Sequence, residues 1–265
     1  MTELDSARLR EALVAPDGPY AALDVVATTG STNADLREAA EAGAADRTVL
    51  IAEEQTAGVG RQNRNWVSPA GAGLYLSVLL RPGDVPVSGV GSLALVAGLA
   101  LTDACDDVDV DAVLKWPNDL LAAGGKLAGV LAELVSPGVV VLGIGLNVLP
   151  LCDVPPGPGG LPATSLGENG ASTTDRSEIA AALLRSLAER EAAWRAAGGD
   201  LGAAGLLDEY RSRCSTLDTR VEVSVPEGAP ITGRAADVDA AGRLVVETDG
   251  GERTTVFAGD VVHLR

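Results

Sequence analysis

Aromatic and basic residues are both scarce in this chain of 265 residues. Phe, Trp and Tyr together make up only 3%, so the core must be built mainly from Ala, Val and Leu. Lys and Arg number 20 against 37 Asp and Glu, which gives a formal net charge of −17. Because an acidic surface repels phosphate backbones and anionic lipid headgroups, we expect no nucleic-acid partner and no membrane partner.

Histidine and cysteine are also rare. The single histidine is His263, near the C-terminal end, so a Ser-His-Asp or Cys-His mechanism has no histidine in the main part of the chain. One histidine cannot form a histidine metal site. The three cysteines, Cys105, Cys152 and Cys214, form no CxxC pattern, which indicates neither a disulfide framework nor a zinc site. We therefore predict no protein-bound metal and chemistry performed by Arg, Lys, Asp and backbone donors.

The chain also lacks long hydrophobic runs. The longest, such as Leu93 to Leu101, are well short of the roughly 20 residues that a bilayer span needs. Met1 to Arg10 carries four charges and has no apolar stretch of the kind found in a signal peptide. Together with free thiols, which suit a reducing compartment, these absences predict a soluble, cytoplasmic protein.

Strand and helix patterns mix irregularly over the first 215 residues. Strands are predicted at 23–26, 48–52, 74–80, 113–116, 126–135 and 139–148, and helices at 34–42, 90–104, 175–197 and 201–214. Asp175 is the expected cap of the third helix, and Ser136-Pro137-Gly138 is the expected turn between the last two strands. Without regular βαβ alternation, an α+β fold with a mixed sheet is favoured over a doubly wound sheet.

The character of the chain changes after Ser215. Five short strand-like runs, at 219–225, 231–238, 244–248, 254–257 and 261–264, are separated by Gly, Pro and Asp. About fifty residues of this kind predict a small β-barrel. We therefore predict two domains, residues 1–215 and 216–265.

A glycine- and arginine-bearing loop runs from Gln55 to Trp66. Gly58 and Gly60 free the backbone to approach a ligand, and successive N–H groups in such a loop can bind an anion. Arg61 and Arg64 add forked donors suited to phosphate or carboxylate, and Trp66 offers a flat face to a base. A surface loop with solvated arginines is an equally good interpretation of this segment taken alone.

A second group contains Lys115, Asn118, Asp119 and Lys126, which follow one another within a dozen residues. Two cations, a carboxylate and an amide suit the phosphates of a magnesium-bound nucleotide. Taken alone, a lysine in the position of Lys126 usually marks only a solvated strand end, and the two residues after Pro117 are equally well explained as turn formers.

Two weaker patterns complete the set. Gly143-Ile144-Gly145-Leu146-Asn147 places glycines within a strand, which is typical of close backbone approach. Ser31-Thr32-Asn33 follows a short strand and, taken alone, is better explained as a helix cap.

The ordered set of motifs resembles the biotin–protein ligases. The resemblance rests on Ser31-Thr32-Asn33, Gln55-Thr56-Ala57-Gly58 with Gly60-Arg61, Arg64 and Trp66, Lys115-Trp116-Pro117-Asn118-Asp119, Gly125-Lys126-Leu127-Ala128-Gly129, and Gly143 to Asn147, in the family's order. The terminal β unit is similar to that family's SH3-like C-terminal domain. The resemblance implies a catalytic domain with the fold of class II aminoacyl-tRNA synthetases, and no N-terminal DNA-binding domain, because only about twenty residues precede the first strand.

The resemblance also implies an activity: ATP and biotin, with Mg²⁺, give biotinyl-5′-AMP, and biotin then passes to one lysine of a biotin carboxyl carrier domain of an acyl-CoA or pyruvate carboxylase. It implies a biotin site at Ser31, Thr32, Asn33, Gln55, Gly58, Gly60, Arg61, Lys126, Gly129 and Gly145. The implied ATP residues are Arg61, Arg64, Trp66, Lys115, Asn118, Lys126 and Asn147, and the implied catalytic residues are Arg61, Lys126 and Asp119. The oligomeric state that it implies is a monomer or a ligand-linked homodimer.

The loop departs from the family's Gly-Arg-Gly-Arg-x-Gly-Arg pattern at two positions. Val59 replaces the first arginine, and we expect weaker loop ordering or weaker retention of the adenylate. Asn63 replaces the third glycine and should keep the turn, because Asn tolerates left-handed backbone geometry.

Three other functions compete with the ligase interpretation. A lipoate or octanoate–protein ligase shares the fold, but Lys115 to Asp119 and the terminal β unit favour biotin. A biotin-binding sensor with weakened catalysis is disfavoured by the retained Arg61, Lys126 and Asp119. A biotin-regulated repressor is disfavoured by the charge of −17.

Overall fold

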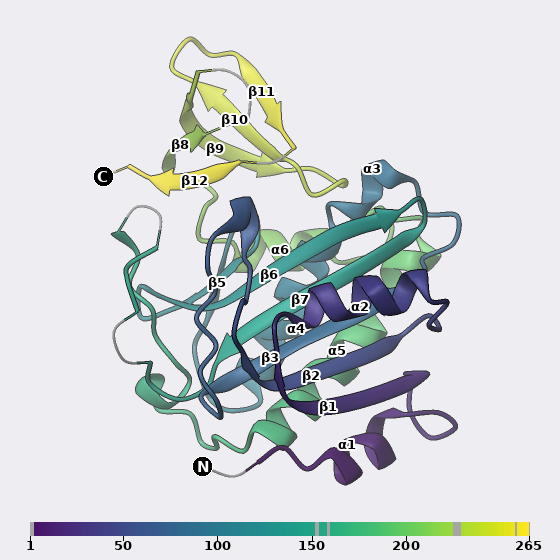
Figure 1. Ribbon diagram of the computed structural model, residues 1–265. Helices are drawn as coiled ribbons and strands as arrows, with labels where there is room; N and C mark the ends of the chain where they lie inside the picture. The colour runs from purple at the N-terminus through teal and green to yellow at the C-terminus, as the bar shows by residue number, and fades with distance from the viewer. Residues whose placement is uncertain (1–2, 152–153, 158–159, 225–228, 258, 265) are drawn as a thin grey trace.

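A seven-stranded mixed sheet forms the centre of the larger part of the molecule (Figure 1). The computed structural model describes residues 3–151, 154–157, 160–224, 229–257 and 259–264. The strands are β1 (Ala22–Thr29), β2 (Thr48–Gln55), β3 (Gly73–Leu80), β4 (Val113–Lys115), β5 (Asp119–Ala122), β6 (Gly125–Ser136) and β7 (Val139–Asn147). Their order is β1-β2-β3-β7-β6-β5-β4, and only β1 and β2 pair in parallel. The expected α+β fold with a mixed sheet is confirmed.

Helices cover both faces of this sheet. The helices are α1 (Ser6–Leu13), α2 (Thr32–Glu41), α3 (Val87–Val90), α4 (Leu93–Asp106), α5 (Arg176–Ala196) and α6 (Leu207–Arg213). In Figure 1, α2 crosses the near face over β3 and β7, whereas α4 and α5 lie behind the sheet. Strand β3 shows why both faces need covering: Val78 packs into the main core, whereas Leu79 packs with Leu36 of α2.

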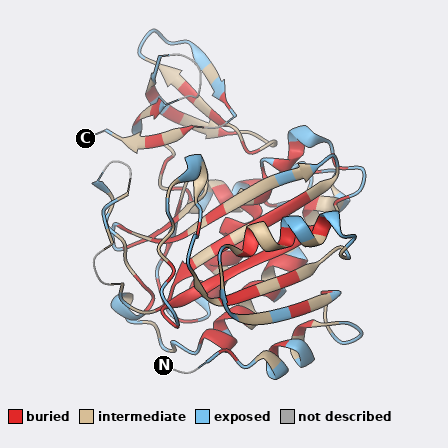
Figure 2. Cartoon of the chain, viewed as in Figure 1, coloured by how far each residue is buried: buried red, intermediate tan, exposed pale blue. Residues whose placement is uncertain are grey.

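Helix α4 is apolar on nearly all sides and is the central core helix. The stretch Val87–Asp106 is long and apolar enough to cross a membrane by length and composition, but 72% of its apolar 18-residue window is buried inside the molecule. A helix that is hydrophobic all round and packed by α5 and β6 has the environment of a core helix. Figure 2 shows the same pattern as buried positions concentrated on the central strands and the helices behind them.

The C-terminal unit is one antiparallel sheet of five strands, set apart at the top of Figure 1. It contains β8 (Arg220–Ser224), β9 (Ile231–Val238), β10 (Leu244–Thr248), β11 (Arg253–Val256) and β12 (Asp260–His263), in the order β11-β10-β9-β8-β12. Alternate residues such as Val221, Val223 and Val246 are buried, as expected for a small two-faced sheet. This sheet agrees with the predicted small β unit, although Val225, the end of the first predicted strand, lies outside the described residues.

Several element predictions agree with the structure in detail. Asp175 caps α5, accepting hydrogen bonds from the backbone N–H groups of Ser177 and Glu178. The turn at Ser136-Pro137-Gly138 joins β6 to β7, with Gly138 at φ +74°. Cys105 and Cys214 are free and buried, and burial raises the pKa of Cys105 to about 12. Cys152 lies outside the described residues.

Other predictions were wrong or incomplete. The helix predicted at 201–214 begins only at Leu207, because the chain before it turns through Gly205 at φ +73°. Strand β5 and helix α1 were not predicted. Helix α1 has a recognisable cap, since the Asp5 carboxylate accepts from the Arg8 N–H at 3.0 Å.

Candidate active site

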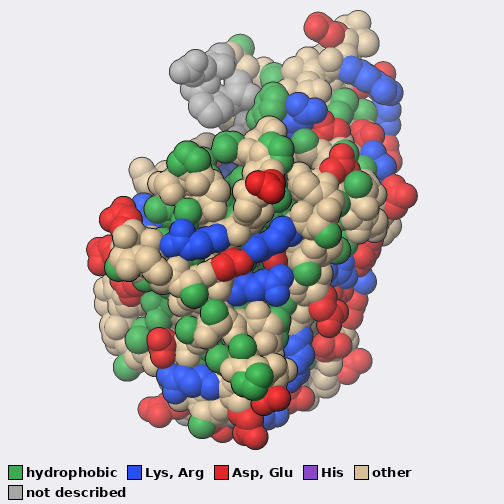
Figure 3. All heavy atoms as spheres, turned by 90° about the vertical axis from the view of Figure 1, so that its right-hand side faces the viewer, with side chains coloured by type: hydrophobic (Ala, Val, Ile, Leu, Met, Phe, Trp, Pro, Cys, Tyr) green, Lys and Arg blue, Asp and Glu red, His purple; other side chains and the backbone are tan. Residues whose placement is uncertain are grey.

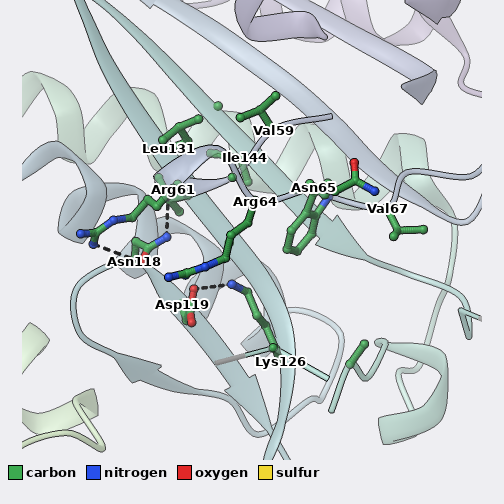
Figure 4. Close-up of a pocket in the computed structure, with 18 of the residues that line it drawn as sticks. Val59, Arg61, Arg64, Asn65, Val67, Asn118, Asp119, Lys126, Leu131 and Ile144 are labelled. Atoms are coloured by element: carbon green, nitrogen blue, oxygen red, sulfur yellow. Dashed lines mark hydrogen bonds and ion pairs between the residues drawn. The ribbon is translucent and has the colours of Figure 1, made fainter. Parts of the chain in front are cut away.

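A cavity of about 550 Å³ opens where β6 and β7, the loop after β2, and the C-terminal unit meet (Figure 4). The predicted site residues that line it are Ser31, Thr32, Asn33, Gln55, Gly60, Arg61, Arg64, Trp66, Lys115, Asn118, Asp119, Lys126, Gly129, Gly145 and Asn147. Residues separated by more than 100 positions thus converge on one space. Gly58 is not among the lining residues.

One end of the cavity is polar but uncharged. Gln55, the last residue of β2, accepts a hydrogen bond through Oε1 from the Thr32 backbone N–H at 2.9 Å, and Thr32 Oγ1 lies 3.1 Å from the same oxygen. Ser31 occupies the N-cap position of α2, but its side chain makes no capping hydrogen bond. Because Gln55 satisfies the first free N–H group of α2 instead, the Ser31 hydroxyl is left to face the cavity.

The glycine-bearing loop is folded on itself as a narrow hairpin. The Trp66 N–H donates to the Gly58 carbonyl at 2.8 Å, and the Gly60 N–H donates to the Arg64 carbonyl at 2.7 Å. The turn at its tip has Gln62 at φ +54° and Asn63 at φ +56°. The expectation that Asn63 keeps the left-handed turn is therefore confirmed. A Cβ on Gly58 would lie 2.6 Å from the Trp66 carbonyl, so this glycine closes the hairpin instead of lining the cavity.

The indole of Trp66 lies on a strip of glycines on β6 and β7. A Cβ on Gly145 would lie 2.4 Å from Trp66 Nε1, and a Cβ on Gly129 would lie 3.2 Å from Trp66 Cζ3. The prediction of close approach at the strand glycines is thus confirmed, although the group that approaches is a side chain. Trp66 Nε1 packs against Gly145, is buried and has no hydrogen-bond partner.

Four cations line the rest of the cavity. The Lys126 ammonium lies 2.6 Å from Asp119 Oδ1 (Figure 4). It also lies 5.4 Å from the centre of the Trp66 ring. Arg61 donates to Asn118 Oδ1 at 3.4 Å and to the Gly259 carbonyl at 3.3 Å. Burial lowers the pKa of both Arg61 and Lys115. Partly desolvated cations of this kind attract anions more strongly than solvated ones.

Two asparagines of the cavity wall, Asn118 and Asn147, are held by backbone groups. Asn118 Nδ2 donates to the Val130 carbonyl at 2.8 Å, which leaves Oδ1 directed toward Arg61. Asn147 Nδ2 donates to the Thr164 carbonyl at 2.9 Å, and its buried Oδ1 has no hydrogen-bond partner. Both amides are thus fixed in one orientation.

The C-terminal unit contributes residues that the sequence did not single out. Asp260 forms an ion pair with Arg64, and the Val261 carbonyl accepts from Lys115 Nζ at 2.8 Å. Together with the Gly259 carbonyl, three consecutive residues at the start of β12 contact three of the four cations. Ser77 and Glu133, which hold Asn33, were also missed. A lone Asp at the start of a strand, or a Ser or Glu within one, carries no pattern that could have identified it.

Metal ligands are few in this cavity. Within the described ranges, no group of three or more His, Cys, Asp or Glu side chains is placed to hold a metal ion. A divalent cation would therefore need ligands from a bound phosphate, with Asn118 and Asp119 as the available oxygen donors.

The arrangement defines a class of enzyme. An uncharged polar end suits a neutral ring with N–H and C=O groups, and a cationic end suits a carboxylate together with a polyphosphate. A carboxylate held beside a nucleotide phosphate is the geometry of acid activation by adenylation.

Comparison with known proteins agrees with this class. Residues 25–148 match the model of the biotin/lipoate A/B protein ligase family, and residues 216–264 match that of the biotin protein ligase C-terminal domain. The chain is 47% identical to a biotin–[acetyl-CoA-carboxylase] ligase of Mycobacterium tuberculosis, over 99% of this chain and 96% of the relative. It is 34% identical to the enzyme of the same name from Paracoccus denitrificans, over 89% and 98% of the two chains.

A solved structure shares the whole architecture. The biotin protein ligase from Aquifex aeolicus, in complex with biotin and ATP, superposes with a TM-score of 0.76 at 29% identity, covering 93% of this chain and all of that one. The chain belongs to the biotin/lipoate A/B protein ligase family.

Proposed function

We propose that this protein is an ATP-dependent biotin–protein ligase that forms biotinyl-5′-AMP and transfers biotin to a lysine of a carboxylase carrier domain. The observation that carries the proposal is the union, in one cavity, of an uncharged polar end at Thr32 and Gln55 with the cations Arg61 and Lys126. A relative that shares nearly the full chain carries the corresponding enzyme name.

The first step activates the biotin carboxylate. Ser31, Thr32 and Gln55 hold the ureido ring, so that the carboxylate lies toward Arg61 and Lys126. One carboxylate oxygen attacks the α-phosphorus of ATP, and pyrophosphate leaves with the electron pair of the broken P–O bond. Arg61, Arg64, Lys115 and Lys126 stabilise the negative charge that builds on the phosphates. Trp66 flanks the adenine, and Asn147 supplies a further polar contact.

Mg²⁺ would enter with the ATP phosphates and reduce their charge. Asn118 and Asp119 are the oxygen donors that fit it, since the described part of the cavity offers no complete set of protein ligands. The protein's own contribution is to orient the phosphates through its cations.

The second step transfers biotin to the carrier. The neutral amine of the carrier lysine attacks the acyl carbon of the adenylate, the bond from that carbon to the phosphate oxygen breaks so that AMP leaves with the electron pair, and the amine proton passes to the Asp119 carboxylate. Asp119 lies at the cavity wall beside Lys126 and is placed to receive that amine. The hairpin of residues 58–66 shields the mixed anhydride from water.

Several further features belong to this proposal. The carrier is the biotin carboxyl carrier domain of an acyl-CoA or pyruvate carboxylase. The domain boundary lies near residue 215, and the enzyme works in the cytoplasm as a monomer or a ligand-linked dimer. Acidic and basic side chains are interspersed on the face shown in Figure 3, which therefore offers no continuous basic patch for a nucleic acid.

The test is pyrophosphate release by the purified protein with Mg-ATP and biotin, compared with lipoate and octanoate. We expect pyrophosphate release with biotin but not with lipoate or octanoate. We also expect Lys126→Met to lower kcat on the order of 10²–10³-fold. Release with lipoate or octanoate in preference to biotin would assign the protein to the lipoate/octanoate ligases. Tight biotin binding without pyrophosphate would indicate a sensor.

A further inference from the structure

A chain of buried polar side chains lies behind the uncharged end of the cavity. Asn33 and Ser77 are 7% and 0% exposed, and they join Thr32 to Glu133 on a different strand. Asn33 Nδ2 lies 2.6 Å from Glu133 Oε2, and Asn33 Oδ1 lies 2.6 Å from Ser77 Oγ. Ser77 Oγ lies 2.7 Å from Thr32 Oγ1.

The sheet order explains how these residues meet. Strand β7 lies between β3 and β6, and its Gly143 is paired with Ser77 on one side and with Leu131 on the other. A Cβ on Gly143 would lie 2.2 Å from Asn33 Oδ1. The Asn33 amide therefore occupies the space above Gly143 and reaches from β3 to β6.

Glu133 fixes the orientation of this amide. A carboxylate can only accept hydrogen bonds, so the Asn33 NH₂ must face Glu133 and the Leu131 carbonyl, and the Asn33 carbonyl must face Ser77. The reversed amide would place two acceptors against each other at 2.6 Å. The charged partner makes this contact stronger than one between neutral groups.

The direction of the remaining protons follows. The Asn33 carbonyl can only accept, so the single proton of the Ser77 hydroxyl is donated to it. The contact of 2.7 Å between Ser77 and Thr32 then requires the Thr32 proton. No hydroxyl proton then remains for the longer contact, of 3.1 Å, between Thr32 Oγ1 and Gln55 Oε1. Thr32 Oγ1 consequently presents only lone pairs to the cavity.

From this geometry we infer that Glu133 is a positioning residue that sets ligand specificity through Asn33, Ser77 and Thr32. The chain of four residues, here called the Glu133 relay, makes the Thr32 hydroxyl a hydrogen-bond acceptor. It selects a ligand that carries an N–H group at this position, such as a cyclic urea, over an acyl chain that has none. The inference rests on the proposed function, since biotin supplies the cyclic urea.

The test measures ligand affinity directly, so it does not depend on turnover. Biotin binding to wild type, Glu133→Ala, Glu133→Gln and Ser77→Ala is followed by titration calorimetry. The dissociation constant of octanoate, which has no N–H group, is obtained by competition. Arg37→Ala is the matched control, because Arg37 pairs with the other Glu133 oxygen at 3.4 Å and half of its side chain is exposed.

We expect Glu133→Ala and Ser77→Ala to weaken biotin binding on the order of tenfold, with octanoate unchanged. Glu133→Gln retains an acceptor and should fall between wild type and Glu133→Ala. Arg37→Ala should bind biotin as the wild type does. A general disturbance of the fold would instead weaken both ligands together.

Two outcomes would overturn the relay. One is unchanged biotin affinity in both Glu133→Ala and Ser77→Ala, and the other is a parallel loss of biotin and octanoate binding. Either can occur while the wild type still binds biotin and releases pyrophosphate, which leaves the proposed function intact. A wild type that does not bind biotin overturns the proposed function and, with it, the relay.

Discussion

Glycines on β6 and β7 leave the space that two side chains of the site fill. Gly143 makes room for the Asn33 amide, and Gly145 makes room for the Trp66 indole. Neither glycine has a positive φ, so the requirement is for space and not for backbone freedom. A methyl group at either position would displace a side chain, because the contacts involved are below 3.0 Å.

Gly145→Ala is therefore expected to weaken ATP binding by roughly tenfold or more, because the indole that flanks the adenine must move. The dissociation constant for ATP, measured by calorimetry, checks this. Gly91→Ala is the matched control, since no atom lies within 4 Å of a Cβ there. If Gly145→Ala and Gly91→Ala bind ATP with the same affinity, the glycines under the Trp66 indole do not contribute to ATP binding.

Residue-level reasoning from the sequence identified most of the cavity wall but not its support. Arg61, Lys126 and Asp119 have charged side chains of the kind that bind and activate anionic ligands, and the structure brings them together. Ser77, Glu133 and Asp260 act through partners that lie 44 or more positions away. Their roles depend on strand order, which a single sequence does not contain.

Among the elements, α2 is held at its C-terminal end by Arg81, the residue that follows β3. Arg81 donates to the Ala40 carbonyl in the last turn of α2 and to the Ala44 carbonyl just beyond the helix, both at 3.0 Å. Helix α2 also carries Thr32 and Asn33 at its other end, so its position affects the cavity.

Arg81→Met should lower the free energy of unfolding on the order of 1–3 kcal/mol, because it removes charge-assisted hydrogen bonds to part-buried carbonyls. Urea denaturation measures the change. Arg8→Met, at an arginine whose side chain is mostly exposed, is the comparison and should change the midpoint little. Equal midpoints for the two variants would contradict the capping role.

Strongly patterned elements were predictable, and short ones were not. The sequence signal is strong in the apolar runs of β3 and α4 and at the capped start of α5. Strand β5 has four residues, and its edges are set by pairing with β4 and β6. Too few residues remain there for a periodic signal, so tertiary pairing decides the conformation.

At the scale of the whole molecule, the C-terminal unit completes the site. The start of β12 contacts Arg61, Arg64 and Lys115, and the Trp116 indole N–H donates to the Gly242 carbonyl at 2.9 Å. The unit thus holds the hairpin of residues 58–66 and the strand end at Lys115 from one side.

Asp260→Asn should raise the KM for ATP by roughly two- to fivefold, because Arg64 and the hairpin lose their anchor on β12. Steady-state kinetics at varied ATP measures this. Asp249→Asn, in the exposed pair with Arg220 of the same unit, should have no effect. A fall in the KM for ATP in Asp260→Asn would show that Asp260 competes with the ATP phosphates for Arg64, instead of positioning Arg64 to bind them.

The junction between the two units should also respond to pH. Burial lowers the pKa of His263, and the Lys115 cation lowers it further. His263 Nε2 lies 3.2 Å from the Thr216 hydroxyl, at the junction of the two units. The unfolded chain protonates His263 near pH 6.5 and the folded chain does so only at lower pH, so stability is lost as the pH falls below about 6.5.

Thermal unfolding of the wild type and of His263→Gln measures this effect in buffers from about pH 8 to about pH 5, in steps of roughly one pH unit. We expect the wild type to lose more stability than the variant across the acidic part of this range. Parallel curves for the two proteins would show that His263 does not contribute.

The most direct test of the central claim is mass spectrometry of an intact carrier domain incubated with the enzyme, Mg-ATP and biotin. We expect the addition of one biotinyl group, its absence when the acceptor lysine of the carrier is replaced by arginine, and its loss with the Lys126→Met enzyme. An unmodified carrier, in the presence of continued pyrophosphate release, would contradict transfer to a carboxylase carrier. Addition to the lysine-replaced carrier would contradict a site-specific ligase.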